Sequence, residues 1–293
     1  MRHPGTKLEG EEMSIAVVTD SAADLPSSIR KIHEVNVVPI RVLFGEDQFR
    51  DHLDLTPDEF YRKLRTSKVL PTTSQPSPAD FIQLYRELLG QHKRIISLHI
   101  SSKLSGTYQS ACLARDAVAP DRIDVIDTKS GSMGQGLITI EAARAAASGP
   151  NYEGVLGAVK NAMEGTRLVF TVDSLDHLKR SGRIGKAASL LGTLLSIKPI
   201  LTLGDGELTP MGKVRGSKRI LPCVIECMKE NVQDTAIRVA VIHTNAHERA
   251  CQWLDKIKST FACKEACLVQ CGAVIGVHVG PSGVGVAWIP VGS

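Results

Sequence analysis

The stretch SSKLSGTYQS at residues 101–110 lies between an apolar run at 95–100 and a segment with the composition of a helix. It therefore predicts the end of a strand, a polar loop and the start of a helix. Gly106 allows a sharp turn, and Ser105 and Thr107 can cap the helix while their hydroxyls and the free N–H groups face outward. In an open α/β sheet such a loop lies at the carboxyl end of a strand, where anions bind. Taken alone, the stretch also fits an ordinary capped loop.

Four loops rich in Ser, Thr and Asp are predicted to be strand-to-helix connections in the first half of the chain. The predicted strands cover 15–19, 35–44, 94–100 and 123–127, and the loops cover 20–26, 72–78, 101–110 and 128–136. Because the carboxyl ends of parallel strands lie on one edge of a sheet, we expect the four loops to converge there. The segment 72–78 is interpreted as a loop because its two prolines stiffen the backbone.

The length and apolar content set the domain organisation. The chain has 293 residues, of which 43% are hydrophobic, enough for two α/β domains of about 130 to 150 residues each. Gly149-Pro150 is the strongest boundary signal, so we expect an N-terminal α/β domain at 13–150 and a C-terminal α/β domain at 151–293. Residues 1–12 are polar and unpatterned, which predicts a disordered extension. In the second half, residues 187–203 are predicted to form a buried helix running into a strand.

The composition argues against several classes of function. The net charge is only +4 and is spread along the chain, so no nucleic-acid-binding face is indicated, and an aromatic content of 4% argues against base stacking. Because no uncharged apolar stretch of about 18 residues occurs, we expect at most transient contact with a membrane. The aliphatic composition suits an aliphatic ligand.

Seven cysteines, an odd number, lie mostly in predicted helices and strands. This usage favours a reducing cytoplasm over a secreted disulfide framework. A four-residue spacing relates Cys223 to Cys227 and recurs at Cys263, Cys267 and Cys271. The sequence has no tight Cys-x-x-Cys pair and no histidine at ligand spacing, so we expect free thiols, no metal and no other cofactor.

The common catalytic signatures are missing from the sequence: the Gly-x-Ser-x-Gly elbow, the phosphate loop and His-Glu-x-x-His. The tail at 272–285 holds five glycines around His278, but it does not open a helix after a strand with a following acid, so it is a weak match to a dinucleotide site. Arg183 and Arg215 lie in two basic, Gly-containing turns. Hydroxyls, one histidine and two arginine clusters are better suited to holding a carboxylate than to cutting a bond.

Taken together, these stretches resemble the DegV family, the fatty-acid-binding proteins that serve as the lipid-carrying subunit (FakB) of bacterial fatty acid kinase. The resemblance spans about Ile15 to Ile289. It rests on eight motifs in the family's order: Thr19-Asp20-Ser21 with Asp24-Leu25-Pro26, Thr73-Ser74-Gln75-Pro76-Ser77, Ser102 through Tyr108, Ser132-Met133-Gly134, Gly182-Arg183-Ile184-Gly185-Lys186, Ile197-Lys198-Pro199, Lys213-Val214-Arg215-Gly216 and His278-Val279-Gly280-Pro281. Two positions depart from the pattern, because Ser181 and Ser282 stand where glycine is usual.

The resemblance implies two α/β domains with a fatty acid buried between them. By motif position, the carboxylate would be held by Thr73 and Ser105 near His278, and Arg183 and Arg215 would help to engage a separate kinase subunit. The expected protein is a cytoplasmic, monomeric carrier that presents the carboxylate for acyl-phosphate formation and is not itself the catalyst. An alternative is an acyl-ester hydrolase with Ser105 as nucleophile and His278 as base, although no acid partner for the histidine can be identified from the sequence.

Overall fold

The computed structural model describes residues 14–149, 151–192, 197–232 and 235–291. The predicted disordered extension at 1–12 and Pro150 of the predicted domain boundary lie outside these residues. The strands are β1 Ile15–Asp20, β2 Val35–Val38, β3 Arg41–Phe44, β4 Asp47–Arg50, β5 Thr72–Ser74, β6 Arg94–His99, β7 Ile123–Asp127, β8 Arg167–Thr171, β9 Ile197–Gly204, β10 Glu207–Arg215, β11 Ile237–His243, β12 Cys263–Gln270 and β13 Val284–Pro290. The α-helices are α1 Ser27–Ile32, α2 Pro57–Thr66, α3 Pro78–Leu89, α4 Thr107–Val118, α5 Ser132–Ala147, α6 Tyr152–Gly165, α7 Asp176–Arg180, α8 Ile220–Val232, α9 His247–Thr260 and α10 Ala273–Val279, with short 3₁₀ helices at Ser21–Ala23, Gly185–Leu190 and Ser217–Arg219.

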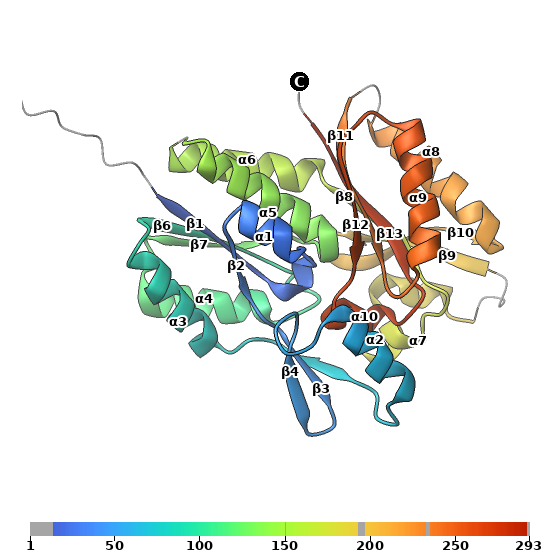
Figure 1. Ribbon diagram of the computed structural model, residues 1–293, viewed down its shortest axis with the longest axis horizontal. Helices are drawn as coiled ribbons and strands as arrows, with labels where there is room; N and C mark the ends of the chain where they lie inside the picture. Colours follow the sequence, from blue (N-terminus) through green and yellow to red (C-terminus); the bar gives the residue numbers. More distant parts are fainter. Residues whose placement is uncertain (1–13, 150, 193–196, 233–234, 292–293) are drawn as a thin grey trace, which may run out of the picture.

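The first half of the chain forms a parallel sheet of four strands in the order β2-β1-β6-β7. Alternation along β1 directs Ala16 and Val18 toward α3 and α4, and Val17 toward α5. Both faces of the sheet are therefore covered by helices, as Figure 1 shows, which confirms the predicted α/β class for this half.

The predicted strand at 35–44 is divided in the structure. Residues 35–38 form β2 of the parallel sheet, whereas residues 41–44 form β3 of a separate antiparallel sheet in the order β4-β3-β5. Pro39 lies at the break, where it has no N–H to give to a continuing ladder. The segment predicted as a loop at 72–78 begins with β5, whose Thr73 pairs with Val42. The loop prediction was therefore wrong for residues 72–74. In the order β4-β3-β5, β5 is an edge strand, so pairing with β3 alone is enough to form it.

The second half forms a mixed sheet of six strands in the order β10-β9-β8-β13-β11-β12, in which only β11 and β12 are paired in parallel among the described strands. Helices α8 and α9 pack on its outer face through residues such as Met228 and Trp253. The inner face contributes Ala240 and Ala287 to a core cluster that also includes Leu98 of the parallel sheet. Helices α5 and α6 lie between the two sheets and bury side chains in this shared core (Figure 1).

One prediction for the second half was wrong in the residues that the structure describes. Of the predicted buried helix and strand at 187–203, residues 193–196 lie outside the described residues, and the described part consists of the end of a 3₁₀ helix at Gly185–Leu190, in which only Ala187 is buried, and of β9. The glycine-rich tail opens a helix after a strand, since α10 follows β12, but no Asp or Glu follows that helix, so it stays a weak match to a dinucleotide site. A Cβ at Gly276 would overlap the ring of Phe60 in α2, so this glycine in α10 allows close packing that helix propensity alone does not predict.

Candidate functional site

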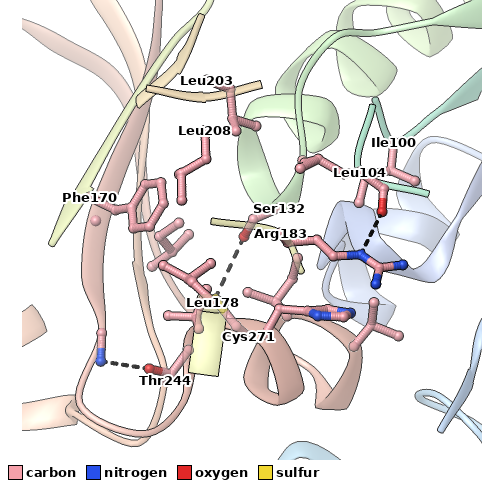
Figure 2. A pocket seen from close by; sticks show the side chains of 18 of the residues that line it. Ile100, Leu104, Ser132, Phe170, Leu178, Arg183, Leu203, Leu208, Thr244 and Cys271 are labelled. Atoms are coloured by element: carbon pink, nitrogen blue, oxygen red, sulfur yellow. Dashed lines mark hydrogen bonds between the residues drawn. The ribbon is translucent and has the colours of Figure 1, made fainter. Parts of the chain in front are cut away.

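A cavity of about 490 Å³, here called the main cavity, lies at the seam between the two halves. The N-terminal half lines it with Thr73 to Gln75, with the loop after β6 and with the start of α5, and the C-terminal half lines it with residues of the mixed sheet and α10. Figure 2 shows Phe170, Leu178, Leu203 and Leu208 gathered on one side of this space. The walls are thus mainly apolar, with polar side chains concentrated at particular points.

One polar group of the main cavity joins the two halves directly. Thr73 of β5 and His278 of α10 share a hydrogen bond, with 2.9 Å between Oγ1 and Nε2. Ser105 lines the same cavity from the loop before α4, but its hydroxyl is 2.8 Å from that of Thr107 and also accepts the backbone N–H of Thr107 at 3.3 Å. The structure therefore brings all three predicted carboxylate-binding residues to one cavity, and it couples Thr73 directly to His278.

The predicted capping of α4 is corrected in detail. The N-cap residue is Gly106, which has no side chain to make a cap hydrogen bond, but the hydroxyl of Ser105 accepts the N–H of the first helical residue, Thr107, as predicted. Thr107 is the first helical residue and is fully buried, so its hydroxyl does not face outward. A Cβ at Gly106 would overlap the end of the Gln75 side chain, so a larger residue there would displace the Gln75 amide from the cavity wall that it lines.

His278 is electrically neutral at neutral pH. Burial, followed by the positive charge of Arg183, lowers the pKa of its imidazole to about 4. Its Nδ1 is buried and has no hydrogen-bond partner among the described residues. A neutral imidazole can donate one hydrogen bond to a carboxylate and accept another from a hydroxyl, so His278 together with Thr73 can complete the binding of an acid head group.

Arg183 and Arg215 occupy different places. Arg183 lines the main cavity, where its Nε donates to the carbonyl of Leu104 at 3.1 Å (Figure 2) and its Nη1 donates to the carbonyl of Ser181 at 2.6 Å. Arg215 is exposed at the end of β10 and does not line the main cavity. The structure thus gives Arg183 a position beside the ligand space in addition to any role toward a partner.

Two buried carboxylates that the sequence did not single out fix the position of α10. Asp24 accepts the N–H of Gly272 at 2.7 Å and the hydroxyl of Ser132 at 2.5 Å, and Asp51 accepts the N–H of Ala273 at 3.0 Å. These are N–H groups of the first turn of α10, where the helix dipole favours negative charge. The two aspartates therefore dock the helix that carries His278 onto the N-terminal half.

The imidazole of His52 belongs to the same buried group. Its Nε2 lies 3.8 Å from Asp24 Oδ1 and 3.9 Å from Asp51 Oδ2, too far for direct hydrogen bonds but close enough for attraction. Although burial opposes it, the two carboxylates raise the pKa of His52 above its usual value. Burial raises the pKa of Asp51 to about 6. The sequence signal for this group, polar residues around 20–24 and 51–54, is no stronger than that of an ordinary turn.

A second buried network links a serine, a histidine and an aspartate in the order of a catalytic triad, but it does not reach the main cavity. The Ser97 hydroxyl lies 2.7 Å from His99 Nε2, and His99 Nδ1 lies 3.0 Å from Asp20 Oδ2. All three residues are completely buried, and none lines the main cavity. Asp20 also accepts the N–H of Ile100 at 3.0 Å, so this network fixes the end of β6, from which the 101–110 loop begins. Its role is to support the site.

The geometry gives no support to the hydrolase alternative. Within the described residues, the Ser105 hydroxyl is bonded to Thr107 rather than to His278, and His278 has no carboxylate on Nδ1. The described residues contain no group of three His, Cys, Asp or Glu side chains that could hold a metal ion. All seven cysteines are free thiols, of which Cys271 lines the main cavity. In the described part of the chain, no helix combines the length and apolarity that crossing a membrane would need.

Comparisons with known proteins agree with this architecture. The family model described as an uncharacterised protein of the DegV family matches residues 14–291. A DegV domain-containing protein of Caldanaerobacter subterraneus is 38% identical over 273 residues, which cover 93% of this chain and 97% of that protein. Two solved structures also share the fold of this chain.

A DegV family protein from Thermus thermophilus, described by its fatty acid binding, superposes with a TM-score of 0.91 at 37% identity and covers 95% of this chain and 100% of its own. A stearic-acid-binding protein from Eubacterium ventriosum superposes with a TM-score of 0.86 at 32% identity, covering 94% and 98% of the two chains. Sequence and fold agree over nearly the whole length of the chain, and the protein therefore belongs to the DegV family.

Proposed function

We propose that this protein binds a long-chain fatty acid in the main cavity, with the carboxylate at Thr73, Ser105 and His278 and the acyl chain among the apolar side chains. The observation that carries the proposal is a mainly apolar cavity of about 490 Å³ with a hydroxyl–imidazole pair contributed by both halves of the chain. The fatty-acid-binding proteins from Thermus thermophilus and Eubacterium ventriosum, which share the fold, support the same ligand class.

The energetics favour such a ligand. Burying about fifteen methylenes at about 0.8 kcal/mol each gives on the order of 12 kcal/mol before the costs of ordering are subtracted. A carboxylate taken out of water needs several donors, which the hydroxyls of Thr73 and Ser105, the imidazole of His278 and the guanidinium of Arg183 can supply. The acyl chain would provide the affinity, and the polar residues would fix its orientation.

We further propose that the protein is a carrier, acting as a monomer in the cytoplasm, that presents the carboxylate to a separate kinase for acyl-phosphate formation. In the main cavity, Ser105 and His278 are not coupled as nucleophile and base, because the Ser105 hydroxyl is bonded to Thr107, and this supports a carrier over a hydrolase. The exposed Arg215 suits contact with such a partner, whereas Arg183 is placed to contact both the partner and the ligand.

Extraction of the purified protein followed by mass spectrometry tests the ligand. A fatty acid of roughly 14 to 18 carbons is expected, and delipidated protein should take up palmitate in a calorimetric titration. Thr73→Ala and Ser105→Ala should each weaken palmitate binding by about tenfold, since each removes a donor from a buried anion. Thr66→Ala, at an exposed hydroxyl of α2, is the matched control. Extracts without fatty acid, together with no uptake of palmitate, would contradict the proposal.

A further inference from the structure

One wall of the main cavity has a separate pocket behind it. This pocket, here called the side pocket, has a volume of about 330 Å³ and lies between α5, the end of α6 and the β9–β10 hairpin. It shares two lining residues with the main cavity, Leu168 of β8 and Leu203 of β9. At these two residues, the wall between the two spaces is therefore a single side chain thick.

This wall stands apart from the polar groups of the main cavity. Thr73, Ser105 and His278 line the main cavity but not the side pocket. In Figure 2, Leu203 lies at the top of the view, away from Arg183. An acyl chain whose carboxylate is held at Thr73 and His278 can therefore run toward this wall and present its methyl end to it.

The two leucines of the wall are held differently. They are neighbours on adjacent strands, because Val169 pairs with Thr202 in the antiparallel register of β8 and β9. Leu168 is buried, and α5 packs so closely on it that a Cβ at Gly134 would be 3.3 Å from its own Cβ. Leu203 is only half-buried and lies on the strand that leads into the hairpin. Leu203 is thus the part of the wall that can change with less effect on the core.

Gly131, the N-cap residue of α5, lies close to Leu203 in the main cavity. A Cβ at this glycine would be 3.7 Å from the side chain of Ile100 and 3.9 Å from Leu203 Cδ1, which are ordinary van der Waals distances. Its φ of −160° is extended, so alanine can adopt the same backbone. A single methyl group here would contact both side chains, which makes this end of the main cavity narrow.

Behind the wall, the side pocket changes character with depth. Ile138 and Met163 add apolar surface next to the two leucines, whereas Lys129, Arg167 and Asp205 are exposed charged residues. The apolar part can accept further methylenes, but the side chains of Leu168 and Leu203 stand between it and the main cavity. The length of the acyl-chain site therefore depends on the size of these side chains.

We propose that Leu203, packed beside Leu168, is a specificity-determining residue that ends the acyl-chain site and sets an upper limit on chain length. A smaller residue at this position joins the side pocket to the main cavity and admits longer chains. This inference rests on the proposed fatty-acid binding of the main cavity. Each buried methylene favours binding by about fourfold, so affinity should rise with chain length until the methyl end reaches the wall and then stop rising.

Competition among chain lengths tests this limit. The delipidated full chain is incubated with an equimolar mixture of laurate, myristate, palmitate, stearate, arachidate and behenate, and the bound acids are extracted and quantified by mass spectrometry. Leu203→Ala should raise the ratio of bound arachidate to bound palmitate by about tenfold or more over the wild type. Leu208→Ala is the matched control, because Leu208 lines the main cavity but not the side pocket, and it should leave this ratio within about twofold.

Gly131→Ala is a second variant with the opposite expected effect. Its methyl group occupies space at the narrow end, so the ratio of bound palmitate to bound myristate should fall by about fourfold. If Leu203→Ala does not fold, as judged by circular dichroism, this variant decides, and an unchanged ratio overturns the proposal.

The remaining outcomes separate this inference from the proposed function. If Leu203→Ala folds and binds palmitate but keeps the wild-type preference, or if Leu208→Ala gains arachidate equally, the limit at Leu203 is wrong and fatty-acid binding stands. If the wild type retains none of the acids, the proposed function is overturned, and this inference with it.

Discussion

The docking of α10 by Asp24 can be tested with a single substitution, Asp24→Asn. Asparagine tolerates the left-handed backbone that Asp24 adopts, with φ of +52°, so the substitution adds little backbone strain. Its one side-chain oxygen can replace only one of the two acceptors that Asp24 offers to Gly272 and Ser132. Loss of a hydrogen bond to a charged group costs about 1.5 to 3 kcal/mol, and loss of the charge at the helix N-terminus costs about 0.3 to 1 kcal/mol.

The free energy of unfolding should therefore fall by about 2 to 4 kcal/mol in Asp24→Asn, measured from urea denaturation midpoints at constant m-value. Amide hydrogen exchange should accelerate within 273–279, and palmitate binding should weaken, because α10 carries His278. Asp54→Asn is the matched control, since Asp54 forms an exposed ion pair with Arg50 and should change the midpoint much less. Wild-type stability in Asp24→Asn, or lost stability without faster exchange in α10, would refute the docking role.

Three further outcomes follow from the site. The pKa of His278 is about 4 in the folded protein and about 6.5 in the unfolded chain, so the free energy of unfolding should fall by on the order of 3 kcal/mol as the pH drops from 6.5 to 4. The variant His278→Gln should lack this part of the loss, and a pH profile identical to that of the wild type would contradict the lowered pKa of His278. Ser282 has a φ of +73°, so Ser282→Gly should raise the free energy of unfolding by about 1 kcal/mol. Ser181 has a φ of −80°, so Ser181→Gly should not stabilise the fold, and equal effects of the two substitutions would exclude backbone strain at Ser282. Arg215→Ala should retain palmitate but lower acyl-phosphate production with a cognate kinase, and added salt should weaken the wild-type reaction similarly. If the variant supports wild-type turnover when the carrier is limiting, Arg215 is only a surface charge.

The sequence predicted the elements whose signals are local. The capping box of Ser77 and Asp80, with proline at the first helical position, is such a local signal, and α3 begins there. The strand at 123–127 was also predicted with its observed bounds. Of the site, the sequence and the family resemblance predicted that Thr73, Ser105 and His278 belong together, and the structure places them around one cavity.

The features that the sequence did not predict depend on contacts between distant segments. The glycine inside α10, Gly276, looks unfavourable for a helix until Phe60 of α2 is packed against it. Asp51 becomes significant only when it meets the N–H of Ala273, which lies 222 residues away in the chain. Arg183 was expected to serve a partner alone, because nothing in its local sequence shows that its turn reaches the loop after β6.

The core shared by the two sheets determines how a ligand can enter and leave. Helices α5 and α6 are buried against both sheets, so swinging the halves apart like a hinge would expose Leu98 and Ala287 to water together with the rest of that core. The rim is built differently. The β9–β10 hairpin is held to the N-terminal half by Asp205, which pairs with exposed Lys103 and Lys129, and by the carbonyl of Gly206, which accepts the buried hydroxyl of Ser101 at 2.7 Å. Exposed ion pairs break at little cost, so we expect that lifting this hairpin, which breaks these pairs and one buried hydrogen bond, costs less than separating the two halves across their shared core.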